Sequence, residues 1–113
     1  MTIIDRRELA FDARALIQVI AGSLNRAKAI GLPALRPTGV VFDPEGHLIR
    51  IVYEPHDHPE VAVAAEHLGA MLVSYCIRAR IPIARLADKD IRIEAGSVVL
   101  AFSTRLADPT TTW

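Results

Sequence analysis

Two stretches of the chain have the hydrophobic pattern of an amphipathic helix. In residues 6–30, apolar positions recur at spacings of three and four, the period of one helical face. These positions are Leu9, Ala13, Leu16, Ile20, Leu24 and Ala27. Asp5 is expected to cap this helix, with Glu8 at the capping-box spacing. Gly31 and Pro33 are expected to end it.

The second helix is predicted over residues 59–80. Asp57 and Glu60 repeat the capping spacing, and Pro59 suits a first helical turn. Pro82 is expected to end the helix, because a residue before proline is pushed out of the helical region. The apolar face consists of Val61, Ala65, Leu68, Leu72, Cys76 and Ala79.

Two hairpins are predicted from period-two alternation and turn residues. Residues 38–42 are rich in β-branched and aromatic side chains, and the turn 43–46 leads into a strand over 48–54. Residues 91–94 alternate strictly, and a second turn leads into a strand over 98–103. The predicted order of elements is therefore α-β-β-α-β-β.

The two halves of the chain resemble each other. Shifting the sequence so that Asp5 lies on Asp57 also superposes the apolar positions of the two helices. A slightly smaller shift lays Gly46 on Gly96 and places Leu48 on Val98. We interpret this as an internal repeat of 5–54 and 57–104, in which each half shields the apolar face of the other. The alternative is that any two amphipathic helices with similar caps align about this well.

The expected fold is a single α+β domain, residues 1–113, built as a two-layer sandwich from a duplicated α-β-β unit. The hairpins would form one four-stranded, mainly antiparallel sheet with both helices on one face. Residues 105–113 are polar and rich in threonine, so a frayed tail is expected there.

The other face of such a sheet would carry apolar side chains that no helix covers. These side chains are Leu48, Val52, Val99 and Ala101. A freely solvated sheet face is normally more polar, which predicts a homodimer through this face or through an edge strand. The alternative is that scattered apolar residues on a surface are common and need no partner.

Composition narrows the function classes. Hydrophobic residues make up 51% of the 113 residues, as in an ordinary globular protein, and lysine plus arginine balances aspartate plus glutamate at 13 each. A net charge of zero argues against a dedicated nucleic-acid or membrane-surface binder. One cysteine excludes an intrachain disulfide and a cysteine-rich metal site. With no apolar run of membrane-spanning length, a cytoplasmic protein is expected.

The segment 54–60 holds the densest group of side chains that bind metals. His56 and His58 form a His-x-His pair with carboxylates on either side. Zinc needs three or four ligands, and the spacing matches no strong metal motif. The competing interpretation is a solvated turn in which Asp57 caps the following helix and is occupied by backbone amides.

Basic residues gather near the expected ends of the two helices. Arg26 and Lys28 end the first, Arg78 and Arg80 end the second, and Arg85 follows shortly after. They are candidates for binding an acidic partner or phosphate groups. The simpler explanation is that positive charges complement the negative end of a helix dipole. Aromatic residues, at 5%, are too scarce to favour stacking on bases.

No catalytic arrangement stands out. Cys76 lies on the apolar face of its helix and is expected in the core, where a thiol is a poor nucleophile. The sequence has no nucleophile elbow and no phosphate-binding loop, and we expect no cofactor. We therefore expect a small non-enzymatic protein that acts through homodimerisation and binding of another protein. The alternatives are a ligand-binding or metal-assisted enzyme using His56 and His58, and a nucleic-acid binder using the basic helix ends.

Overall fold

The computed structural model describes residues 3–22, 28, 31–55, 57–83 and 87–107. Within these residues the chain forms two helices and two three-stranded antiparallel sheets. The predicted α+β class is confirmed, and the single four-stranded sheet is wrong. In chain order the elements are β1 (Ile3–Phe11), α1 (Ala13–Ala21), β2 (Arg36–Asp43), β3 (Leu48–Glu54), β4 (Val61–Ala64), α3 (Ala65–Arg78), β5 (Asp88–Ile93) and β6 (Val98–Ala107).

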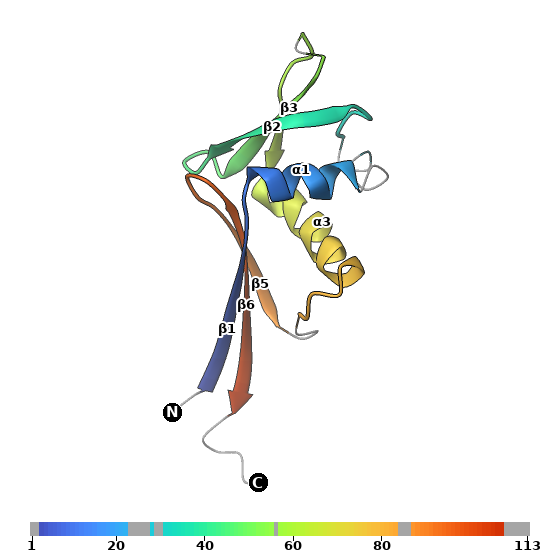
Figure 1. Cartoon of the computed structure of the whole chain (residues 1–113). Coiled ribbons are helices and arrows are strands. Elements are labelled where there is room, and N and C mark those ends of the chain that lie inside the picture. The colour runs from blue at the N-terminus through green and yellow to red at the C-terminus, as the bar shows by residue number, and fades with distance from the viewer. Residues whose placement is uncertain (1–2, 23–27, 29–30, 56, 84–86, 108–113) are drawn as a thin grey trace.

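The two sheets exchange strands between the halves of the chain. One sheet has the order β1-β6-β5 and the other has the order β2-β3-β4. The order β-α-β-β thus occurs twice, and the first strand of each set pairs with the hairpin of the other set (Figure 1). The predicted α-β-β unit lacks this leading strand. Neither hairpin completes its sheet without a strand from the opposite half.

The largest correction concerns the start of the first predicted helix. Residues 3–11 form β1, which pairs with β6 from Ile3 opposite Ala107 to Phe11 opposite Val98. Asp5 therefore lies in a strand, and Asp12 is the helix cap, its side chain accepting a hydrogen bond from the Ala15 amide at 2.8 Å. The local hydrophobic pattern is compatible with a helix and with a strand. Pairing with the distant strand β6 decides in favour of the strand. Of the rest of the predicted helix, residues 23–27 and 29–30 lie outside the described residues.

The second helix also begins later than predicted. Residues 61–64 form β4, in which Val61 lies opposite Ile51 of β3 and Val63 lies opposite Ile49. β-branched residues that alternate in this way fit a pleated surface better than a helix. The helix begins at Ala65, after a cap residue with no side-chain hydrogen bond, so Asp57 does not cap it. It ends at Arg78, close to the predicted end.

Both predicted hairpins are present. β3 has the predicted bounds, and β2 and β5 begin two or three residues earlier than expected. β6 extends through Ala107, so it includes the first residues of the segment expected to fray. The remainder of that segment, 108–113, lies outside the described residues.

The paired strands show which residues of the two hairpins correspond. Ile49 of β3 pairs with Val63, and Val98 of β6 pairs with Phe11, so Ile49 and Val98 hold equivalent places in their sheets. The sequence alignment that placed Leu48 on Val98 is out of register by one residue. Such a slip exchanges the two faces of a strand, because successive side chains point to opposite sides.

The core lies between the two sheets and the helices, with α1 packed against β2 and α3 packed against β5. The buried positions of the helices correspond at the predicted shift: Leu16, Val19 and Ile20 in α1, and Leu68, Met71 and Leu72 in α3. From the strands, fully buried side chains include Ile49, Ile51, Tyr53, Val98 and Leu100. The internal repeat of 5–54 and 57–104 stays a prediction.

The apolar sheet face that was expected to form the dimer interface is not present as one face, because its residues lie on two different sheets. Leu48 and Val52 lie on the outer face of β3, whereas Val99 and Ala101 lie on β6 in the other sheet. Val99 is only 3% exposed, and the other three are half-buried. The four residues therefore form no common surface.

Candidate binding groove

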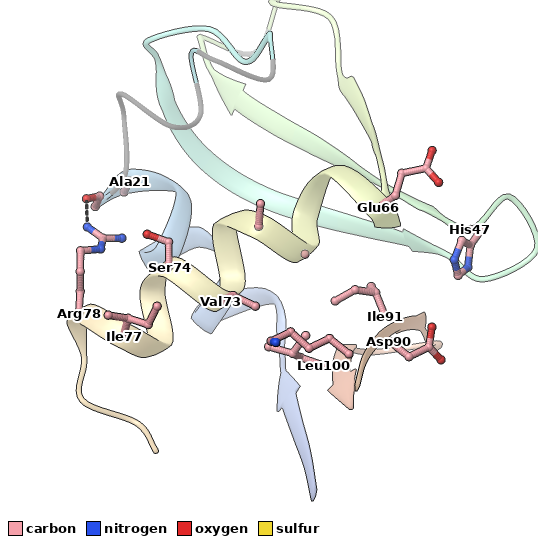
Figure 2. A pocket seen from close by; sticks show the side chains of 14 residues that line it. Ala21, His47, Glu66, Val73, Ser74, Ile77, Arg78, Asp90, Ile91 and Leu100 are labelled. Atoms are coloured by element: carbon pink, nitrogen blue, oxygen red, sulfur yellow. Dashed lines mark hydrogen bonds between the residues drawn. The ribbon is translucent and has the colours of Figure 1, made fainter. Parts of the chain in front are cut away.

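A groove of about 1270 Å³ runs along the outward face of α3 (Figure 2). α3 itself forms the floor. The end of α1 bounds the groove on one side, and β5 bounds it on the other. His47, from the turn between β2 and β3, lies near one end. These four elements and β6, which contributes Leu100, build this surface together.

The floor consists of small and apolar side chains. Its residues are Gly69, Ala70, Val73, Ser74 and Ile77. The opposite face of α3 is fully occupied in the core, where Leu68, Leu72 and Cys76 have no exposed surface. No charged residue occurs in the stretch 68–77, so the outward face of the helix is uncharged for more than two turns. A solvent-facing helix surface usually carries charged residues.

Ile77 is the most exposed large apolar side chain in the described part of the chain, at 64%. Figure 2 shows it beside Val73 on the groove side of α3. Both residues line the groove, together with Ile91 and Leu100 from the neighbouring sheet. The apolar part of the groove is therefore continuous from the helix to the sheet.

Glycine at position 69 reflects the close approach of β5. A Cβ atom at Gly69 would lie 3.4 Å from the Cγ1 atom of Ile91, so the strand packs directly against the helix floor. Gly22, the other glycine on a predicted helix, is instead the C-cap of α1, where its amide donates to the Gln18 carbonyl oxygen.

Charged residues stand at both ends of the groove and on one of its walls. Glu66 and His47 mark one end, and Arg78 marks the other (Figure 2). Arg78 donates from Nη1 to the Gly22 carbonyl oxygen at 3.1 Å, which joins the end of α3 to the end of α1. Lys89 and Asp90 stand on the β5 wall. The groove thus has an uncharged floor, an acidic residue at one end, a basic residue at the other, and one residue of each charge on the β5 wall.

The predicted metal ligands are only partly described. His56 lies outside the described residues. His58 packs edge-on against the Tyr53 ring, with 5.6 Å between ring centroids, and its Nδ1 hydrogen-bonds with the Pro59 carbonyl oxygen at 2.8 Å. Among the described side chains no three His, Cys, Asp or Glu residues come close enough to hold a metal ion. The metal site at His56 and His58 stays a prediction.

The predicted basic sites are also only partly described. Arg26 and Arg85 lie outside the described residues, and Lys28 and Arg80 are exposed. Arg80 follows α3 with a left-handed backbone, at a φ of 57°. Of the three that the structure describes, Arg78 lines the groove. An anion-binding role for the set stays a prediction.

Cys76 lies in the core, as expected. It has no exposed surface, and burial raises the pKa of its thiol above the ordinary value. A thiol held in this way stays protonated at neutral pH and is a poor nucleophile.

The sequence analysis did not identify the groove, although one signal was present. The uncharged stretch 68–77 is long enough to bring every face of a helix round to solvent or core. A helix that packs one face in the core and has no charge on any other face either has a second face covered by protein or leaves an uncharged surface exposed to water. The walls had no comparable signal, because α1, β5 and the β2–β3 turn meet α3 only in the folded chain.

Comparisons of the chain with protein-family models, with curated proteins and with solved structures find no match. Over the described residues, neither helix combines the length and the apolar character needed to cross a bilayer. The geometry of the groove is therefore the basis for a functional proposal.

Proposed function

We propose that this is a small, non-enzymatic cytoplasmic protein that acts through homodimerisation and through binding of another protein, in an adaptor or regulatory role. The observation that carries the proposal is the uncovered apolar floor of the α3 groove, with Ile77 64% exposed in it. Removing apolar surface from water contributes roughly 25 cal/mol per Å². Continuous apolar surface of this kind therefore favours association with another surface.

The position of the charges supports recognition of a partner over chemistry. Glu66 and Arg78 stand at opposite ends of the groove, Lys89 and Asp90 stand on its β5 wall, and the floor between the two ends carries no charge. A catalytic centre needs acid, base or nucleophile side chains close to one reacting atom. An apolar centre with a polar rim is instead the usual anatomy of an interface between proteins.

The proposal is tested by replacing Ile77 with glutamate. Sedimentation equilibrium of the natural protein should give an average mass above the 12.4 kDa of one chain at tens of micromolar. Ile77→Glu should shift the protein toward monomer, because a carboxylate would have to be desolvated in the interface. The matched control is Val41→Glu, since Val41 is also exposed, at 43%, but does not line the groove. A natural protein that remains strictly monomeric at these concentrations would contradict the proposal.

A further inference from the structure

We infer that the occupant of the groove is the α3 helix of a second copy of this chain, running antiparallel across a two-fold axis. In this arrangement Glu66 of each chain lies beside Arg78 of the partner subunit. The inference rests on the proposed homodimer and names its surface and register.

The groove floor allows two helices to approach closely. Gly69 and Ala70 have the smallest side chains on the outward face of α3 and lie near its middle, next to Ser74, which lines the groove but is only 9% exposed. Helix axes pack about 8–10 Å apart depending on the side chains between them, and small residues permit the shorter distance. With the two-fold axis between Ala70 and Ser74, the middles of the two helices meet at these residues.

In this arrangement the larger apolar side chains of α3 are buried in the groove of the partner subunit. Val73 and Ile77 flank the small residues on the side of α3 that faces β5. Across a two-fold axis, each would enter the partner's groove between its helix and its β5 wall. A two-fold interface uses the same patch twice, so one uncovered groove on each chain is sufficient.

The charges at the two ends favour the antiparallel direction. Glu66 lies in the first turn of α3, and Arg78 is its last residue, about 18 Å farther along the helix axis. Antiparallel pairing places each carboxylate beside a guanidinium, whereas parallel pairing places like charges side by side. The chain has no net charge, so two copies do not repel each other at long range.

The other exposed surfaces of the described chain fit a second copy less well. The outer edge strand β1 carries the consecutive charged residues Asp5, Arg6, Arg7 and Glu8, which are typical of edges that resist pairing. The outer face of β2 and β3 carries the ion pair of Arg50 with Asp43, at 3.4 Å, next to exposed Val41. The floor of the α3 groove, within residues 68–77, carries no charged residue.

Charge reversal with complementation tests the inference. Glu66→Arg and Arg78→Glu, each alone, place like charges at both ends of the dimer, so each should weaken self-association about tenfold or more in sedimentation equilibrium. An equimolar mixture of the two variants should recover association, because the mixed dimer again pairs opposite charges at both ends. The control pair is Glu60→Arg and Arg36→Glu, since both residues are exposed and lie outside the groove.

The outcomes separate this inference from the proposed function. If both variants associate like the natural protein, the homodimer uses another surface and the inference is overturned. If each variant is weak and the mixture stays weak, the antiparallel register is overturned. If the natural protein is itself monomeric, the homodimer and the inference fail together.

A second variant covers the case in which Arg78→Glu fails to fold. Ala70→Trp places a large side chain at the centre of the floor, on an exposed position, and should weaken association about tenfold or more. Ala62→Trp, on an exposed position of β4 outside the groove, is its control. Equal association of the two tryptophan variants would overturn the inference.

Discussion

At the scale of single residues, the clearest anomaly is the hydroxyl group of Tyr53. Tyr53 belongs to β3, and its side chain is fully buried in the core. Its hydroxyl oxygen has no hydrogen-bond partner within the described part of the chain. Burial raises the pKa of this hydroxyl. A buried polar group without a partner costs about 1–3 kcal/mol, so Tyr53 carries an energetic penalty that phenylalanine would avoid.

We therefore expect Tyr53→Phe to leave the free energy of unfolding unchanged or to raise it by about 1 kcal/mol. Urea unfolding at neutral pH measures this, with Tyr75→Phe as the control at a half-buried ring. Above the usual tyrosine pKa of about 10, the unfolded chain binds fewer protons than the folded chain at this residue. The natural protein should thus lose stability with rising pH more steeply than Tyr53→Phe. A loss of stability in the variant at neutral pH would show that the hydroxyl has a partner.

At the scale of elements, the caps of the two helices differ from the sequence prediction. Asp12 accepts a hydrogen bond from the Ala15 amide at 2.8 Å and satisfies one free donor at the start of α1. Asp57, which was predicted to cap the second helix, is exposed and lies well before the start of α3 at Ala65. The helix cap is therefore Asp12, which the sequence analysis did not single out, and not Asp5 or Asp57.

Asp12→Ala should lower the free energy of unfolding by about 1 kcal/mol, the usual cost of losing an N-cap. Asp57→Ala should change it by less than about 0.5 kcal/mol, as expected for a surface substitution without a structural role. Thermal unfolding of both variants at neutral pH gives the comparison. If Asp57→Ala were the more damaging of the two, the placement of the second helix would be wrong.

The sequence predicted correctly those elements that depend on interactions between residues close together in the chain. The β2–β3 turn is an example, because Asp43 accepts a hydrogen bond from the Gly46 amide at 2.9 Å within the turn itself. β1 was not predictable in this way. Its apolar residues Leu9 and Phe11 suit a helix or a strand, and the choice depends on β6, at the other end of the chain. The groove was missed for the same reason, since its walls come from elements that meet α3 only after folding.

At the scale of the whole molecule, the exchange of β1 and β4 makes the halves depend on each other. The β5–β6 hairpin has its third strand from the first half, and the β2–β3 hairpin has its third strand from the second half. β1 and β6 extend together beyond the body of the protein (Figure 1). A hairpin without a third strand or a packed face is marginally stable in water.

We expect that fragments 1–55 and 57–113 do not fold separately and that mixing them restores structure. Each fragment alone would leave its two-stranded hairpin without the third strand that the other half supplies in the intact chain. Circular dichroism of each fragment and of the equimolar mixture measures this. A cooperative unfolding transition in either fragment alone would show that the halves are independent.

The interface itself is tested most directly by amide spectra of the natural protein, labelled with ¹⁵N, recorded from tens of micromolar to millimolar concentration. The account predicts that the signals of Gly69, Ala70, Val73 and Ile77, and those of residues 89–91, shift or broaden as the concentration rises. The signals of residues 5–8 on the edge of β1 should stay constant. Spectra that do not change over this range, or that change at β1 and not at α3, would contradict a homodimer formed through the α3 groove.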